Sequence, residues 1–548
     1  MQLKSILAAG CLALSFALAA CGGGGGSSED DVLTLRRGIS AKVDALDPHR
    51  SSAAWENIII GDMFHGLMQH APDGEVIPAV AESWEISEDD LTWTFKLKET
   101  TWSDGVPLTA NDFVFAMRRI QDPAVASQYS SLLYVIKNAE AVNNYNPEDG
   151  SGLPPEELGV RAIDDYTLEI TLMKPAPYLL GLLTHYTTFP VPQHIVEQYG
   201  DAWVQPDNIE VNGPYKLVYW VTGDQIVTEK NPLFYEADTV CFERVAYFEL
   251  TDASAVERRI EAGELDINND FDGGRKAEID QRFPGWARTS PALLTTYWSF
   301  NSSEEPFDDV RVRKALAIAI DREFIVNQVL TPGFIPAYSF VPPGINNYET
   351  ERPQVDWADT PREERLVEAR RLLEDAGFGP DNPLEFEYIY RSTGDNPKAA
   401  PVAQANWNEI APWVNAQILL QDTKVLYARL RQSNFEVSDG GWLADYNDPL
   451  NYLYLLDSAT GQQNYGNYDN PEFDALLEQA GQERDLVRRA ELFAAAEAII
   501  LEEKPITPMW FQVTKNLVDP SLTGWEENAE DNHRSRWMCR AEAPTESE

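Results

Sequence analysis

Basic residues, histidine and cysteine are all scarce in this chain of 548 residues. Lys and Arg together number 43 against 89 Asp and Glu, which leaves a formal net charge of −46. A surface this acidic repels phosphate backbones and anionic headgroups, so it argues against nucleic acid as a partner and against electrostatic attachment to a membrane. The six histidines and four cysteines show no metal-ligand spacing, so we expect neither a metal nor a cofactor.

Recognisable catalytic motifs are missing as well. The chain contains no nucleophile elbow, phosphate-binding loop, dinucleotide fingerprint or Cys-x-x-Cys pair. Residues 268–273 resemble a calcium loop only in outline, because Asn268 stands where Asp usually leads and Glu278 comes one residue too early. We therefore expect an acidic turn there, and a protein that is not an enzyme.

Long apolar runs are absent after the N-terminal segment. Residues 6–20 form an uncharged apolar stretch behind Lys4, which is too short to span a bilayer and is typical of a signal-peptide core. The stretch ends in Leu-Ala-Ala-Cys-Gly, which resembles the bacterial lipobox. We expect a lipoprotein signal peptide at 1–20, lipidation at Cys21, and an anchor with a flexible tether over 21–31. The alternative is an ordinary secretory signal in which the Cys occurs by chance.

Export leaves few thiols. Cys11 is removed with the signal peptide and Cys21 carries the anchor, so Cys241 and Cys539 remain. In an oxidising compartment such as the periplasmic space, a surviving pair is a disulfide candidate. The sequence gives no distance between the two thiols, so the bond stays open at this point.

What the chain does contain is enough apolar material for more than one core. At this length several domains are expected, and irregularly alternating strand and helix patterns indicate a mixed α/β class. Strands are predicted at 92–97 and 167–172, and helices at 308–330, at 361–376 and, as one or two helices, at 471–503. Asp308 and Asp309 suit the start of the first helix, while Thr360 is the expected cap of the second and Gly377 its end.

Aromatic residues are abundant, with 15 Trp, 22 Tyr and 22 Phe. Most of them must be core. Residues 440–449 (Gly-Gly-Trp-Leu-Ala-Asp-Tyr-Asn-Asp-Pro) are unusual, because they follow the apolar strand-like segment 435–437. Loops after strand ends are where α/β proteins place ligand contacts, and here Trp442 can wall a pocket while Asp445 pairs with a cation.

Several segments taken together resemble a known family. They are residues 46–49, 61–67, 81–86, 93–95, 102–114, 212–217, 229–232, 263–266 and 307–313. In order and spacing, the chain is similar to the extracellular solute-binding proteins of family 5, the receptors that feed ABC importers. Residues 126–129 and 444–449 resemble the oligopeptide-binding branch most.

The resemblance implies an α/β, two-lobed periplasmic-binding-protein fold of type II, in the large cluster C class, with an extra inserted N-terminal domain. It implies lobe I at 32–64, 193–291 and 513–548, the extra domain at 65–192, and lobe II at 292–512. The lobes would close over an oligopeptide and deliver it to the permease subunits of an ABC transporter in the inner membrane. The protein is expected to act as a monomer.

The resemblance also implies a ligand site. Its expected residues are Ala54, Tyr129, Tyr297, Gly441, Trp442, Leu443 and Asp445. Asp445 would accept the peptide's α-ammonium group, and backbone near Ala54 and at 441–443 would pair with the extended ligand. For Tyr129 and Tyr297, packing in the core is the competing interpretation.

The chain departs from the family pattern where relatives hold the ligand's carboxylate. Two positions that are usually Arg read Leu430 and Asp439, and a His-bearing segment reads 394–397 (Gly-Asp-Asn-Pro). We expect Asp439 to join Asp445 at the ligand and to favour cationic peptides. Leu294 and Leu443 replace two cysteines that are often bridged, which implies that a bond between Cys241 and Cys539 would be this chain's own. An oligosaccharide or another small solute is the alternative ligand, and an envelope hydrolase is a more distant reading.

Overall fold

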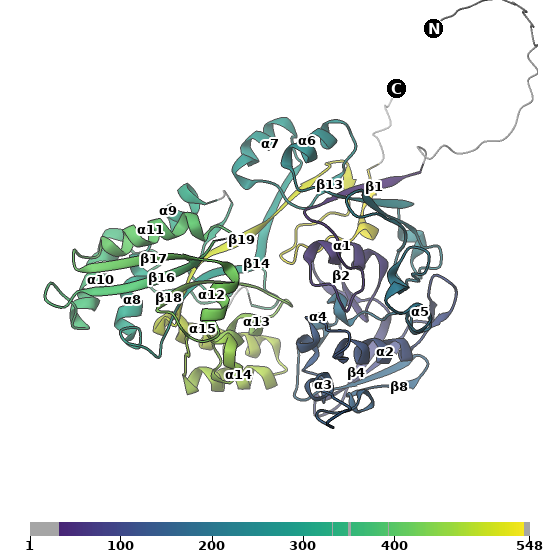
Figure 1. Cartoon of the computed structure of the whole chain (residues 1–548), viewed down its shortest axis with the longest axis horizontal. Helices are drawn as coiled ribbons and strands as arrows, with labels where there is room; N and C mark the ends of the chain where they lie inside the picture. Colours follow the sequence, from purple (N-terminus) through teal and green to yellow (C-terminus); the bar gives the residue numbers. More distant parts are fainter. Residues whose placement is uncertain (1–31, 331–332, 349–351, 393, 542–548) are drawn as a thin grey trace, which may run out of the picture. The chain divides into compact units, whose positions relative to one another are not determined.

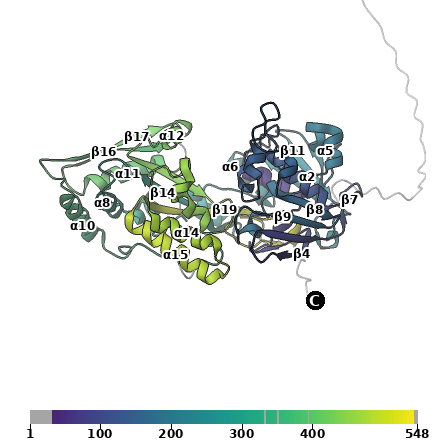
Figure 2. The same ribbon diagram turned by 90° about the horizontal axis from the view of Figure 1, so that it is seen from below.

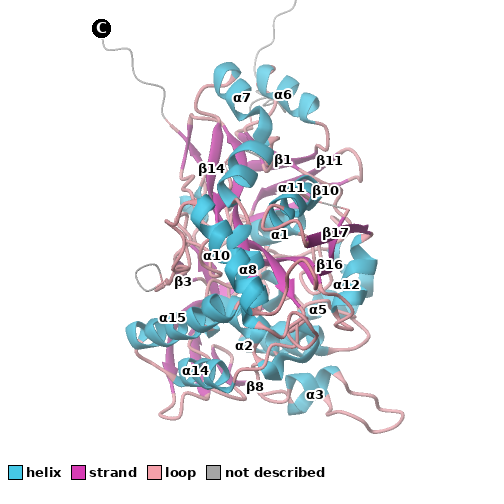
Figure 3. Ribbon diagram, turned by 90° about the vertical axis from the view of Figure 1, so that its left-hand side faces the viewer, coloured by secondary structure: helices cyan, strands magenta, loops and turns pink. Residues whose placement is uncertain are grey.

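The computed structural model describes residues 32–330, 333–348, 352–392 and 394–541. The signal peptide, Cys21 and the tether, predicted within residues 1–31, lie outside the described residues. Helices and strands are interspersed along the described chain, as in the mixed α/β class (Figure 3). No helix of the described residues is long and apolar enough to span a membrane.

Eleven strands of the described chain form one sheet. Its order is β10 (Tyr215–Trp220), β11 (Gln225–Lys230), β12 (Arg244–Glu249), β1 (Thr34–Ile39), β13 (Ile267–Asn268), β19 (Ile506–Val518), β14 (Ala287–Phe300), β18 (Val437–Leu443), β16 (Leu384–Arg391) and β17 (Val414–Gln421), with β15 (Ile335–Pro336) pairing with β19. The pairs β1–β12, β16–β17 and β16–β18 are parallel, while β14 is antiparallel to both of its neighbours.

The two longest strands, β14 and β19, run side by side (Figure 1) and connect different cores. Val518 at the end of β19 belongs to a core that also contains Leu35 and Trp93, whereas Trp298 and Trp510 belong to another. The ladder between β14 and β19 is interrupted between Pro291 and Thr295. Because Pro lacks an N–H group, it cannot contribute a donor to the ladder there.

A separate four-stranded sheet lies within residues 81–171 of the described chain. Its order is β4 (Ala81–Ile86), β5 (Thr92–Leu97), β9 (Thr167–Thr171) and β8 (Val160–Asp164), and short pairs elsewhere join β2 (Met68–His70) to β3 (Val76–Pro78), β6 (Thr100–Thr101) to β7 (Pro107–Leu108) and β20 (Leu522–Thr523) to β21 (Cys539–Arg540). The predicted strands at 92–97 and 167–172 are confirmed. In the first, the alternating side chains of Trp93, Phe95 and Leu97 are buried.

The described chain also contains α-helices, connected by loops and by shorter helical turns. They are α1 (Ala54–Met63), α2 (Ala110–Gln121), α3 (Ala139–Asn143), α4 (Leu179–Leu182), α5 (Gln193–Tyr199), α6 (Ala253–Glu261), α7 (Lys276–Arg282), α8 (Val310–Ala319), α9 (Arg322–Phe324), α10 (Arg362–Asp375), α11 (Asn396–Asn408), α12 (Thr423–Leu430), α13 (Leu450–Leu453), α14 (Pro471–Gln482) and α15 (Leu486–Glu503). The prediction of one or two helices over 471–503 is confirmed as two, α14 and α15, which lie side by side (Figure 2).

Two helix boundaries differ from the predicted ones. The predicted helix start at Asp308 and Asp309 is confirmed to within one residue, since Asp309 is the N-cap of α8 and accepts a hydrogen bond from the Arg311 N–H at 2.8 Å. Helix α8 does not continue to residue 330. Ile320 is extended, and the Asp321 carboxylate accepts from the Phe324 N–H at 3.0 Å to start α9, because an Asp is a strong N-cap. Pro361, not Thr360, precedes α10, without a side-chain cap.

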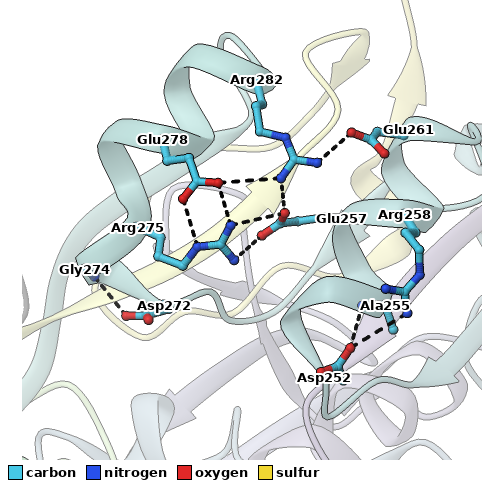
Figure 4. Close-up of polar contacts among 10 residues, drawn as sticks. All are labelled: Asp252, Ala255, Glu257, Arg258, Glu261, Asp272, Gly274, Arg275, Glu278 and Arg282. Atoms are coloured by element: carbon cyan, nitrogen blue, oxygen red, sulfur yellow. Dashed lines mark hydrogen bonds and ion pairs between the residues drawn. The ribbon is translucent and has the colours of Figure 1, made fainter.

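The predicted acidic turn at 268–273 leads from β13 towards α7. The Asp272 carboxylate accepts from the Gly274 N–H at 3.0 Å, which starts the turn before α7. Helices α6 and α7 are joined by ion pairs in which Arg275 and Arg282 share the carboxylate of Glu257 (Figure 4). Among the described residues, no group of three or more His, Cys, Asp or Glu side chains could hold a metal ion.

A disulfide joins Cys241 to Cys539, with the two Cα atoms 5.3 Å apart. The bond connects residues 298 positions apart in the sequence. Cys539 lies in β21, which pairs with β20, so the bond holds the end of the described chain against the segment between β11 and β12.

Candidate ligand-binding site

A cavity of about 1150 Å³ lies between two parts of the chain that are far apart in sequence. Tyr129 and Tyr178 line it from residues 128–182, while Trp442, Asp445 and Tyr454 line it from residues 442–482. All of these residues belong to one compact unit that begins at Thr34. The cavity is large enough for a ligand of several hundred daltons, and six of the residues that line it are aromatic.

Asp445 is a half-buried acid that lines this cavity without a partner. Its carboxylate has no hydrogen bond or ion pair with any of the described residues, and burial alone raises its pKa to about 6. Burial first, and then the charge of Asp445, raise the pKa of Tyr129 and Tyr454, which places both phenols within electrostatic reach of the carboxylate. A half-buried carboxylate without a counter-ion favours a cationic ligand group.

Asn451 positions the two residues that the sequence singled out. Its side-chain oxygen accepts hydrogen bonds from the Trp442 indole N–H at 2.7 Å and from the Asp445 backbone N–H at 3.2 Å. Asn451 is buried at the start of α13, and Asp448 just before it forms a buried ion pair with Arg489. The loop that presents Asp445 is therefore held by fixed polar contacts.

The strand that leads to Asp445 has a partly unpaired edge. On one side, every residue of β18 pairs with β14. On the other side, β16 pairs with β18 only at Val437 and Ser438. On that side, Gly440 to Leu443 have no strand partner among the described residues. We had expected 440–449 to be a loop; the structure extends the strand to Leu443, and the free edge can accept an added strand.

The expected ligand residues divide into two groups. Asp445, Trp442 and Tyr129 line the large cavity, while Gly441 and Leu443 line a second cavity of about 230 Å³.

The other expected residues lie elsewhere. Tyr297 is 5% exposed and packs edge-on against Phe340, so it is a core residue. Ala54 is the first residue of helix α1 and lines neither cavity.

Asp439 requires a correction. We expected its carboxylate to face the ligand, but its side chain is fully buried and accepts a hydrogen bond from Arg391 Nε at 2.7 Å. The charge of Asp439 is therefore compensated inside the protein.

Leu294 on β14 and Leu443 on β18, which stand where relatives often have a bridged pair of cysteines, are directly opposite one another.

Sequence reasoning missed Arg391, Asn451 and the pair Tyr178 and Tyr446. The signal for Arg391 was present, because the alternating apolar residues of 384–390 precede it and a Gly-containing turn follows at 394. That is the pattern that drew attention to 440–449. Nothing in the sequence indicated that Tyr178 stacks on Tyr446, since their contact joins segments 268 positions apart (446 minus 178).

Comparisons with known proteins agree on one family. The model of the bacterial extracellular solute-binding proteins, family 5, middle region, matches residues 75–464. The periplasmic oligopeptide-binding protein OppA of Salmonella typhimurium is 36% identical over 527 residues, 95% of each chain. The deoxycholate-binding periplasmic protein YgiS of Escherichia coli, named as probable, is 34% identical over 484 residues, 88% of each chain. The solved unliganded open form of the periplasmic murein tripeptide-binding protein MppA superposes with a TM-score of 0.83 at 32% identity, covering 93% of this chain and 98% of that one.

Proposed function

The chain belongs to the bacterial extracellular solute-binding proteins of family 5, and from this premise we propose that it captures short peptides and delivers them to an ABC importer. The relatives described above are named as binding proteins. The proposal therefore includes binding without turnover of the ligand.

The observation that carries the peptide assignment is the unpartnered carboxylate of Asp445 at the end of a strand with a free edge. A peptide presents an α-ammonium group to a carboxylate and a backbone ladder to an unpaired strand. Pairing through the backbone at Gly440 to Leu443 gives affinity that does not depend on the ligand's side chains. The aromatic walls contribute apolar contact to side chains of differing size.

Closure over the ligand is the proposed conformational step. Strands β14 and β19 connect the cores on the two sides, and their ladder is interrupted between Pro291 and Thr295. A gap in the ladder lets the two halves of the ribbon bend relative to each other, as hinges in binding proteins do. If a saturating ligand leaves the radius of gyration in solution scattering unchanged, closure is not the mechanism.

Attachment to the membrane is proposed to occur through lipidation of Cys21. The lipobox-like sequence before it supports this, and the acidic surface removes the electrostatic alternative. Expression with radiolabelled palmitate should label the wild-type protein and leave the Cys21→Ser variant unlabelled. If the variant were still labelled, the lipid would be attached to a residue other than Cys21.

The peptide assignment is tested by isothermal titration of tetra-alanine and its N-acetylated twin. We expect the free amine to bind at least about tenfold more tightly, because only it offers a charged donor to Asp445. Asp445→Asn should bind both peptides alike. Equal binding of the two peptides by the wild-type protein would exclude the ammonium contact.

A second ligand class has one observation in its favour. Six aromatic residues line the large cavity, and a relative is named for binding deoxycholate. Native mass spectrometry of the purified protein separates the classes. Peptide masses in the complex support the first proposal, and sterol or hexose masses support the alternative of an oligosaccharide or another small solute.

A further inference from the structure

Arg391 occupies a position beside the free edge that none of the expected residues explains. It is the last residue of β16, which runs parallel to β18 and stops pairing with it at Ser438. Its side chain lines the second cavity, of about 230 Å³, together with Thr296, Gly441 and Leu443. A strand added to the edge of β18 would begin where β16 leaves it, so its end would meet Arg391.

The guanidinium group is held on one side and open on the other. Arg391 Nε donates to Asp439 Oδ2 at 2.7 Å and Nη1 donates to the Tyr427 hydroxyl at 3.2 Å. Nη2 has no hydrogen-bond partner among the described residues, and the side chain is 19% exposed. A Cβ atom at position 441 would lie 3.2 Å from Nη2, so Gly441 leaves room beside the free donor.

The charges around this cavity favour an anion. Asp439 is fully buried and fixed by Arg391, so it presents no surface to a ligand. The acid in the cavity wall, Asp395, is paired with Lys398 at 2.9 Å. At this end of the free edge of β18, the Arg391 guanidinium therefore offers a cationic donor that no acid in the cavity wall occupies. At the other end, the Asp445 carboxylate offers a negative charge without a partner.

We propose that Arg391 binds a carboxylate of the ligand, with Asp439 as the positioning residue that orients its guanidinium fork. The proposal rests on the peptide assignment and adds its second end. Strand β18 ends at Leu443, two residues before Asp445, so the four residue steps from Gly441 to Asp445 span at most about 13 Å, the length of about four residues of extended peptide. The ligand would run antiparallel to β18, with its amino end at Asp445 and its carboxylate at Arg391.

The test compares tetra-alanine with its C-terminal amide by isothermal titration. Wild-type protein should bind the free acid at least about tenfold more tightly than the amide, since a charge-assisted bond to Arg391 is lost in the amide. In Arg391→Met that ratio should fall to about one. Because this variant leaves Asp439 buried without a partner, the double variant Arg391→Met with Asp439→Asn is measured beside it, and should give the same ratio.

A matched control is Arg429→Met, which removes a partly buried Arg that pairs with Glu387 and lines neither cavity. It should retain the wild-type preference for the acid. An amidated peptide with a penultimate Glu, compared with its Gln twin, distinguishes a side-chain carboxylate from the terminal one as the group that Arg391 takes.

The outcomes separate this proposal from the peptide assignment. If tetra-alanine binds but acid and amide bind alike, and Glu and Gln twins do too, Arg391 is not an anion site and the peptide assignment stands. If the double variant keeps the wild-type preference for the acid, the carboxylate binds elsewhere. If neither tetra-alanine nor its N-acetylated twin binds to the wild-type protein, both proposals are wrong.

Discussion

Tyr178 and Tyr446 stack face to face at the wall of the large cavity, with ring centroids 4.8 Å apart and planes 11° from parallel. Tyr178 lies just before α4, and Tyr446 follows Asp445 in the loop before α13. Both residues line the cavity. The pair is therefore a direct contact between its two walls, one residue away from the proposed ammonium site.

We predict that the Tyr178→Ala variant releases peptide faster. If the walls separate when ligand leaves, the ring contact must break, and aromatic pairs of this kind are worth about 0.5–1.5 kcal/mol. The dissociation rate should rise about two- to tenfold, measured by stopped-flow tryptophan fluorescence. Tyr199→Ala, on α5 and outside the cavity, is the control and should leave the rate unchanged. An unchanged rate in Tyr178→Ala would show that the stack does not resist opening.

Peptide affinity should fall in mild acid. Burial raises the pKa of Asp445 to about 6 in the empty protein, whereas an ammonium ligand needs the charged form. Affinity for a free-amine peptide should therefore be full above pH 7 and decline below pH 6, by up to about tenfold per pH unit. Binding at pH 6 should release protons, which titration in buffers of different ionisation enthalpy detects.

The stability of the empty protein should respond in the opposite direction. Because the folded pKa of Asp445 lies above its ordinary value of 3.8, this group stabilises the fold below pH 3.8, and that contribution is lost as pH rises through 6.

Asp445→Asn should remove the pH dependence of affinity for the free amine. An N-acetylated peptide with the same pH profile as the free amine would contradict the assignment.

The loop carrying Asp445 should depend strongly on one buried ion pair. Arg489 Nη2 donates to Asp448 Oδ1 at 2.9 Å, and their side chains are 6% and 9% exposed. Arg489→Ala leaves the buried Asp448 carboxylate without its cationic partner, so we expect the free energy of unfolding in urea to fall by about 3–5 kcal/mol. Arg488→Ala next to it removes an exposed pair with Glu491 and should cost no more than about 1 kcal/mol. Equal costs would mean that burial does not govern the pair.

Local elements followed from the sequence where a single periodicity decided them. The strand at 92–97 is confirmed because alternate residues pack into one core. The helix start at 308–309 is confirmed because the Asp309 carboxylate there meets free N–H groups. Helix 308–330 was predicted too long, since the second cap at Asp321 was read as part of the helical pattern. Here a local hydrogen bond prevailed over apolar spacing.

The site was only half accessible from the sequence. Asp445 and Trp442 were found because Gly, Trp and Asp follow a strand directly, which is a short-range signal. The ion pair between Asp439 and Arg391 was not found, because it depends on β16 lying beside β18. The sequence does not give that strand pairing. Asp439 alone suggested an acidic site; with Arg391 beside it, the same position presents a cation.

The bond between Cys241 and Cys539 should contribute to stability and not to ligand binding. It closes a loop of 298 positions, and a loop of that size restricts the unfolded chain far more than the folded one, by about 3–5 kcal/mol in the chain-entropy model. Reduction with a phosphine should therefore lower the urea midpoint of the wild-type protein. Neither cysteine lines either of the two cavities of the ligand site, so peptide affinity should not change.

The Cys241→Ser and Cys539→Ser double variant supplies the control for that measurement. Its urea midpoint should be lower from the start and should not respond to the reductant, since the variant has no bond between positions 241 and 539 to reduce. If the reductant shifted both proteins equally, its effect would not come from the disulfide. If neither reduction nor the double substitution lowered the midpoint, the folded chain would already hold β21 in place through its pairing with β20 and the Arg540 contacts to Asp266 and Asp519.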